Sequence, residues 1–172
     1  MKKANSKIMI LVVVCLIIAS IGTLINNLSI KKEDEVKSRY YTGFISRVQR
    51  LEETLAQTND TRSIGDPVQM LDVYTSIILV NDRLNLLKNN TKSFTDMDVL
   101  INDFLIFRDE YGYLLRNQLE GNGVDSEVQL KVDNQIKLFL SDLPKEYENS
   151  KEFSNQFRAA EEHIKPLLHL NY

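Results

Sequence analysis

Residues 70–87 read "MLDVYTSIILVNDRLNLL", and apolar side chains recur through this stretch at alternating intervals of three and four residues. They are Met70, Val73, Ile77, Val80, Leu84 and Leu87. This spacing places them on one face of an α-helix that packs against other helices at shallow angles. Leu71, Tyr74 and Ile78 widen the stripe, so we expect this helix to be the most buried of the chain.

The same pattern recurs in four other segments, so the sequence predicts helices at 32–57, 67–89, 96–120, 126–142 and 148–168. The additional stripes are Tyr41, Phe44, Val48, Leu51 and Leu55; Met97, Leu100, Phe104, Phe107, Tyr111 and Leu114; Val128, Val132, Ile136, Phe139 and Leu143; and Phe153, Phe157, Ala160, Ile164 and Leu167. β-branched runs lie inside this helical periodicity, and we predict no strand.

Residues at the segment boundaries favour the same division. Asp66 is expected to cap the second helix, with Pro67 at its first position and Gln69 reaching back as a capping-box partner. For the later boundaries we expect Thr95 as a cap, Gly121 as a stop, Asp125 or Ser126 as the next cap, Pro144 as a stop, and Pro166 as a kink or end.

Short connections make successive helices antiparallel neighbours. The predicted fold class is therefore all-α: an N-terminal transmembrane helix followed by an up-and-down antiparallel bundle of four helices plus a shorter fifth. The fifth helix either completes the fourth column or lies across one end. Gly112, in the middle of a predicted helix, either admits a close neighbour or marks a kink.

An uninterrupted apolar run from Ile8 to Ile25 precedes the bundle. As a helix it is about 27 Å long, close to the roughly 30 Å hydrocarbon core of a membrane. We predict a cytoplasmic N-terminus at 1–7, a transmembrane signal-anchor at 8–28 and an extracytoplasmic bundle at 29–172. Lys2, Lys3 and Lys7 support this orientation. Cleavage after "SIG" (Ser20–Gly22) and lipid attachment at Cys15 are the alternatives.

Charge and composition exclude several classes of function. The chain has 21 basic and 24 acidic residues, and because three basic residues and no acidic ones lie within 1–30, the remainder carries a net charge of −6. Nucleic-acid binding is therefore not expected. Cys15 is the only cysteine, so the bundle has no disulfide.

No arrangement of residues indicates catalysis, and we expect neither an enzyme nor a cofactor. His163 and His169 are the only histidines, and their spacing places them on different helical faces. Glu161 and His163 are a candidate metal-ligand pair, but a solvated helix face is the preferred interpretation, and no metal is expected.

Two segments are candidates for contact with a partner. The loop 58–66 carries Arg62 and Ile64, and loops on a rigid scaffold are common sites of recognition. The C-terminal tail "PLLHLNY" carries Leu170 and Tyr172. This tail either docks onto the bundle or is offered to another protein.

The preferred function is a protein–protein interaction or regulatory module of the bacterial cell envelope. It would be held in lipid through residues 8–28, in contact with an envelope protein of unknown identity. The alternative is a small-ligand sensory domain working through a partner, with a site around Asn81 and Tyr111. In outline the predicted bundle is similar to the extracytoplasmic input domains of bacterial chemoreceptors, a likeness of fold that no motif carries.

Overall fold

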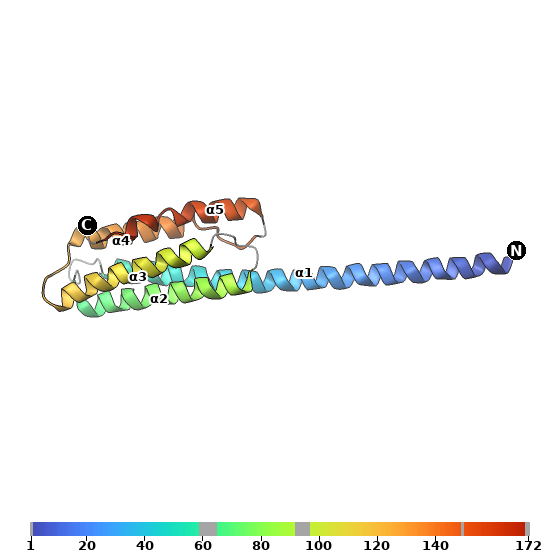
Figure 1. The fold of residues 1–172 in the computed structure, drawn as a ribbon, viewed down its shortest axis with the longest axis horizontal. Coiled ribbons are helices and arrows are strands. Elements are labelled where there is room, and N and C mark those ends of the chain that lie inside the picture. Colours follow the sequence, from blue (N-terminus) through green and yellow to red (C-terminus); the bar gives the residue numbers. More distant parts are fainter. Residues whose placement is uncertain (1, 59–64, 92–96, 149, 171–172) are drawn as a thin grey trace. The chain divides into compact units, whose positions relative to one another are not determined.

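The computed structural model describes residues 2–58, 65–91, 97–148 and 150–170, with side chains described from residue 16 onward. The elements are α1 (Lys2–Thr58), α2 (Pro67–Asn90), α3 (Met97–Leu119), α4 (Ser126–Asp142), α5 (Lys151–Glu161) and the 3₁₀ helix η1 (Lys165–Leu167) (Figure 1). No strand occurs in these ranges. The all-α prediction is confirmed.

The chain divides into two compact units, Met1–Val36 and Lys37–Tyr172. The first unit is the N-terminal part of α1, and its apolar side chains between Leu16 and Ile30 are exposed. Where side chains are described, no helix combines the length and the apolar composition that a membrane crossing requires. The side chains of residues 8–15, part of the expected span 8–28, lie outside the described set.

The expected start of a separate helix at residue 32 is wrong, because α1 continues unbroken to Thr58. No proline or glycine lies between Thr23 and Thr42. The connecting residues therefore form helical hydrogen bonds as readily as the segments on either side.

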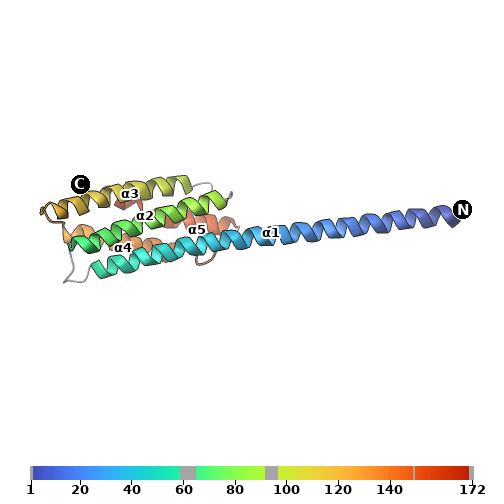
Figure 2. The ribbon, with the colours of Figure 1, turned by 90° about the horizontal axis from the view of Figure 1, so that it is seen from below.

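In the second unit, helices pack in two layers. From Lys37 onward α1 lies beside α2, α2 lies beside α3, and successive helices run in opposite directions (Figure 2). α4 and α5 form the second layer and cover one face of the first (Figure 1). α5 reverses direction after α4 and packs along it, so it does not lie across one end of the bundle.

The bundle core coincides with the predicted stripes. Every stripe residue of all five segments is buried except Val128, which is half-buried. The expected widening of the α2 stripe is only partly observed, because Leu71 is 51% exposed and Tyr74 and Ile78 are half-buried. This side of α2 faces solvent beside α3.

Most predicted boundaries agree with the capping contacts. Asp66 caps α2 by accepting a 2.9 Å hydrogen bond from the backbone N–H of Val68, and Asp125 caps α4 through Glu127 in the same way. The capping-box role of Gln69 is wrong, since its buried Oε1 finds no donor among the described residues. The predicted cap Thr95 lies outside the described residues.

Gly121 ends α3 as expected. Its φ of +81° allows the chain to turn back, so that the N–H of Asn122 bonds the carbonyl of Asn117 at 3.0 Å. A glycine reaches this left-handed conformation without the steric penalty of a Cβ.

The predicted helix 148–168 is too long. α5 ends at Glu161, and the chain tightens through turns into η1, with Pro166 within the first positions of that 3₁₀ helix. The N–H groups of His163 and Ile164 already bond carbonyls three residues back. Pro166 has no N–H and its ring would clash with the carbonyl four residues earlier, so an α-helix cannot continue here.

Candidate functional site

The structure describes only one of the four predicted contact residues. Arg62, Ile64 and Tyr172 lie outside the described residues. Leu170 is 5% exposed and belongs to the core, and its N–H donates a 3.0 Å hydrogen bond to Oε2 of Glu110. Leu170 is therefore not an exposed contact, and of the two interpretations of the tail the structure favours docking onto the bundle for the described residues up to Leu170.

Asn81 and Tyr111, suggested for a ligand site, are both buried in the α2–α3 pair. Asn81 Oδ1 and the Tyr111 hydroxyl have no hydrogen-bond partner among the described residues. Burial raises the pKa of Tyr111 above its usual value. Neither residue lines the two cavities described below.

A second pair of buried polar side chains lies on α4. Gln129 and Asp133 are 2% and 5% exposed, and Asp133 Oδ2 accepts a 2.7 Å hydrogen bond from Nζ of Lys137. Asp133 Oδ1 and both amide atoms of Gln129 find no partner in the described part of the chain. Unpaired buried polar atoms are destabilising, so this side of α4 contributes less to stability than an apolar face of the same size would.

The histidine region has a structural role. His163 Nε2 lies 2.8 Å from Oδ2 of Asp142, which ties the end of α5 to the end of α4. Glu161 is buried. Within the described residues, no three His, Cys, Asp or Glu side chains are arranged to hold a metal ion.

An open cavity of about 370 Å³ lies between α2 and α3. We call it the α2–α3 groove. It is lined by Tyr74, Asp109, Gly112, Tyr113, Leu115 and Arg116. Two tyrosine rings, a leucine and a guanidinium thus surround one hollow.

Gly112 is one of the residues that line the groove. A Cβ at this position would lie 3.1 Å from Cε2 of Tyr74, so the absence of a side chain seats the Tyr74 ring against the backbone of α3. A glycine inside a helix is less favourable than alanine by about 1 kcal/mol. The close approach of Tyr74 explains why a glycine occupies this position. Of the two interpretations of Gly112, a close neighbour or a kink, the first is confirmed.

Apolar side chains extend the groove toward the ends of the two helices. Val68, Leu71, Tyr113 and Leu119 are 68%, 51%, 49% and 67% exposed. Leu71 is one turn before Tyr74, Val68 is one turn before Leu71, and Leu119 is one turn after Leu115. Gln118 Nε2 donates a 2.5 Å hydrogen bond to the carbonyl of Gly65, which fixes the end of α3 beside the start of α2.

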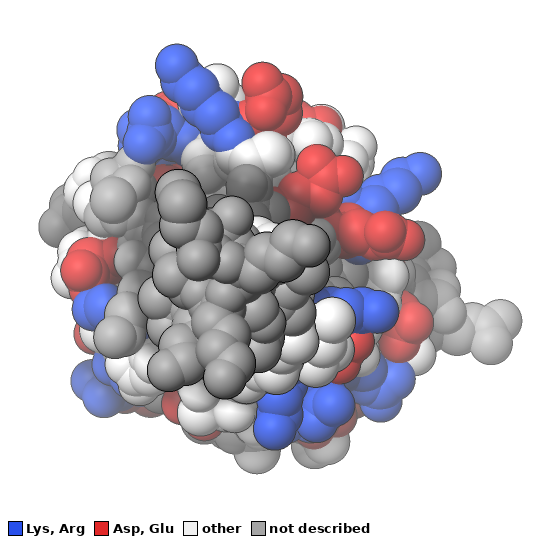
Figure 3. Space-filling view, turned by 90° about the vertical axis from the view of Figure 1, so that its right-hand side faces the viewer, with Lys and Arg blue, Asp and Glu red and all other residues white. Residues whose placement is uncertain are grey.

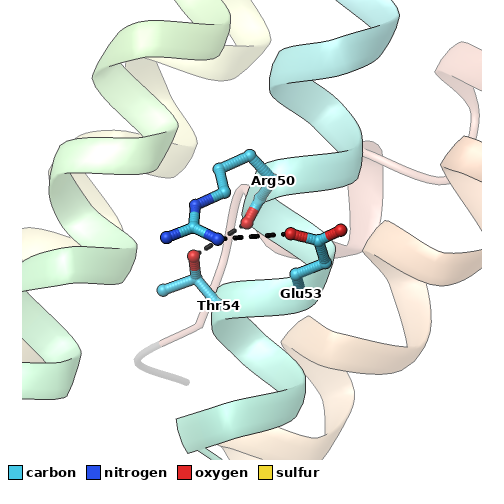
Figure 4. Close-up of polar contacts among 3 residues, drawn as sticks. All are labelled: Arg50, Glu53 and Thr54. Atoms are coloured by element: carbon cyan, nitrogen blue, oxygen red, sulfur yellow. Dashed lines mark hydrogen bonds and ion pairs between the residues drawn. The ribbon is translucent and has the colours of Figure 1, made fainter.

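Arg116 is the uncompensated charge of the groove. The neighbouring Asp109 accepts hydrogen bonds of 2.9 and 2.6 Å from Nε and Nη2 of Arg108. The Arg116 guanidinium makes no ion pair or hydrogen bond with any described residue. Arg50 differs from Arg116, because its Nη1 lies 3.3 Å from Oε2 of Glu53 on the same helix (Figure 4). The hydroxyl of the neighbouring Thr54 donates a hydrogen bond to the backbone carbonyl of Arg50.

A second cavity of about 370 Å³ lies where the chain passes from α4 to α5. It is lined by Pro144, Lys145, Glu146, Glu148, Glu152, Phe153 and Gln156. Beneath it, the rings of Phe153 and Tyr41 pack edge to face at 5.1 Å. The carboxylates of Glu146, Glu148 and Glu152 are exposed.

Charges of both signs are interspersed on the end view of the molecule, without an extended patch of one sign among the described residues (Figure 3). An electrostatic surface of the kind that binds nucleic acid is not present on this face.

No protein-family model, curated protein or solved structure matches the chain.

The α2–α3 groove was not predicted from the sequence. Two signals pointed to it. Gly112 interrupts an otherwise good helix between two tyrosines, and Leu71 and Tyr74 widen the α2 stripe beyond what one partner helix covers. Which helix lies against that edge is a tertiary relationship that periodicity does not contain.

Proposed function

We propose that the protein is a single-pass, membrane-anchored helical bundle of the cell envelope that acts by binding another protein. Residues 8–28 are the anchor, the N-terminus is cytoplasmic, and the bundle lies outside the membrane. Lys2, Lys3 and Lys7 precede the apolar run without any acid, which favours this orientation.

The observation that supports an anchor is the exposure of apolar side chains on all sides of α1. Leu16, Ile17, Ile18, Ile21, Leu24, Ile25, Leu28 and Ile30 are between 50% and 64% exposed. Consecutive residues point about 100° apart, so Leu16, Ile17 and Ile18 alone face most directions. A partner helix would cover only one stripe, whereas lipid covers the whole circumference.

The observation that carries the binding function is the α2–α3 groove with its apolar rim. Tyrosine and arginine are enriched among the residues that dominate protein–protein binding energy, especially where they border a hollow. Arg62 and Ile64 of the loop 58–66 are proposed as further contacts of the same partner, since loops on a rigid scaffold are common sites of recognition.

Two experiments test this function. In intact cells, we expect the full-length chain to stay in the membrane pellet after alkaline carbonate washing, and Cys15→Ser to leave this unchanged. We also expect a photo-crosslinking amino acid at Tyr113 to form an adduct of higher mass, and one at Leu138, an exposed α4 residue, to form none.

A double substitution in the loop 58–66 tests whether this loop contacts the same partner. Arg62→Glu combined with Ile64→Asp is expected to reduce the Tyr113 adduct while leaving the circular dichroism spectrum and thermal midpoint unchanged. Recovery of a mature chain beginning near Thr23 in the soluble fraction would refute the anchor. Equal adducts at Tyr113 and Leu138 would refute a specific contact.

A sensor of small ligands is the second candidate, favoured by the unpaired polar atoms of Gln129 and Asp133 inside the bundle. A ligand that satisfied these atoms would stabilise the folded chain by mass action. A small metabolite that raises the thermal midpoint of the wild type, but not of Gln129→Leu, would support this candidate over the first.

A further inference from the structure

We infer that the α2–α3 groove receives an acidic, amphipathic helix of the partner protein. A large apolar side chain of that helix enters the hollow between Tyr74 and Tyr113, and a neighbouring Asp or Glu pairs with Arg116. The inference rests on the proposed binding function and adds the surface and the chemistry of the partner.

Spacing on α3 indicates that the occupant is a helix. Val99, Ile106 and Tyr113 are 51%, 36% and 49% exposed, and they recur every seven residues along the solvent side of α3. A seven-residue interval keeps apolar side chains in register with a second helix packed lengthwise. Tyr113 belongs to this stripe and also lines the groove.

The extent of the apolar rim distinguishes a protein segment from a small ligand. Small-molecule sites enclose most of their ligand. Here the hollow is open, and the apolar surface continues past it through Leu71, Val68 and Leu119 at the antiparallel ends of the two helices. Such a surface fits the long apolar face of a helix that lies in a groove.

Charge specifies the acidic character of the partner. Asp109 is already neutralised by Arg108, so Arg116 gives the groove one unpaired positive charge on a domain whose net charge is negative. Arg116 is exposed and lines the groove together with Tyr74 and Tyr113, so its guanidinium is accessible to a partner. A carboxylate on the partner can form the bidentate pair that arginine favours.

A pair of synthetic peptides tests this chemistry. Both are about 20 residues long, above the length below which isolated helices are marginal in water. They share one stripe of leucines at heptad spacing, which Glu flanks in the acidic peptide and Lys in the basic one. Binding is measured by fluorescence anisotropy to the full-length protein in phosphatidylcholine nanodiscs, with empty nanodiscs as the blank.

We expect the wild type to bind the acidic peptide about fivefold more tightly than the basic one, a preference that shrinks in high salt. Arg116→Glu should reverse the order of the two peptides. Lys131→Glu makes the same charge change at an exposed position of α4 and should leave the order unchanged.

Two further variants test the shape of the groove. Gly112→Ala forces the Tyr74 ring to shift, because the added Cβ would lie 3.1 Å from it. We expect this variant to bind the acidic peptide several-fold more weakly while its thermal midpoint does not fall. Leu71→Asp should abolish binding, and Leu138→Asp, at a position of similar exposure, should not.

Equal affinity for the two peptides, or an order that Arg116→Glu leaves unchanged, would overturn the inference. A dimer of the full chain that Leu71→Asp dissociates and Leu138→Asp does not would also overturn it, by identifying the occupant as a second copy. A failed peptide test with a persistent, specific Tyr113 adduct in cells would leave the proposed function standing. A chain found only in the soluble fraction would refute the anchor without affecting the peptide result.

Discussion

The phenolic hydroxyl of Tyr41 in α1 donates a 2.5 Å hydrogen bond to the carbonyl oxygen of Pro144, the second residue after α4. Both residues are buried, and the Tyr41 ring also contacts Phe153 of α5. One side chain thus ties the first helix of the bundle to the turn that leads into the last.

Tyr41→Phe retains the ring and removes only this hydrogen bond. Because it leaves the buried Pro144 carbonyl without a donor, we expect the free energy of unfolding to fall by about 1–3 kcal/mol. Urea denaturation followed by circular dichroism measures the change. Tyr113→Phe, at an exposed tyrosine, is the control and should have little effect.

Phe104 lies at the centre of the core. It is fully buried, and its ring centroid is 6.2 Å from that of Phe107 and 5.7 Å from that of Phe139 across the bundle. Phe104→Ala should lower the free energy of unfolding by roughly 3–5 kcal/mol. A denaturation midpoint equal to that of the wild type would show that this face of α3 is not in the core.

Leu170 tests the docking of the C-terminal tail. Its side chain is buried and its N–H bonds Glu110 on α3. We expect Leu170→Ala to lower the free energy of unfolding by about 2 kcal/mol, near the lower limit for buried leucines because chain ends fray. Leu130→Ala, at a 46% exposed position, should change it far less. Equal effects of the two substitutions would contradict docking.

The helical stripes could be predicted because their information is local. A period of three and four residues fixes which side chains share a face, so Phe104 and Phe139 could each be assigned to the core without knowledge of the topology. Caps at Asp66 and Asp125 are local for the same reason, since a capping side chain bonds the N–H two residues ahead.

The α2–α3 groove could not be predicted, because it depends on how two helices meet. Only the approach of Tyr74 to Gly112 shows why the glycine is there. Asp103 is a second case, since Lys165, whose charge acts on its carboxyl group, is 62 residues away in sequence. Neither relationship leaves a periodic signal.

Asp103 leads to a pH-dependent prediction. It is 6% exposed on α3, near Glu162 and Lys165. Burial raises the pKa of its carboxyl group above the usual 3.8, Lys165 opposes the change and Glu162 adds to it. The folded chain therefore binds the proton more tightly than the unfolded chain.

The sign of the effect follows from this difference. A carboxyl group whose pKa is raised on folding contributes to the free energy of unfolding. This contribution is fully present below the unfolded pKa of 3.8 and is lost as pH rises through the folded pKa. Asp103→Asn removes the charge with almost no change of shape. We expect the variant to have a higher thermal midpoint than the wild type at pH 7, and a smaller advantage at pH 3.

Thermal unfolding of the wild type and of Asp103→Asn at several pH values between 3 and 7 measures the difference between their thermal midpoints. Asp82→Asn, at an exposed position of α2, is the control. A constant difference between Asp103→Asn and the wild type across this range would contradict the raised pKa. A variant less stable than the wild type at pH 7 would show instead that the ionised carboxylate is stabilised by Lys165 more than it is destabilised by burial.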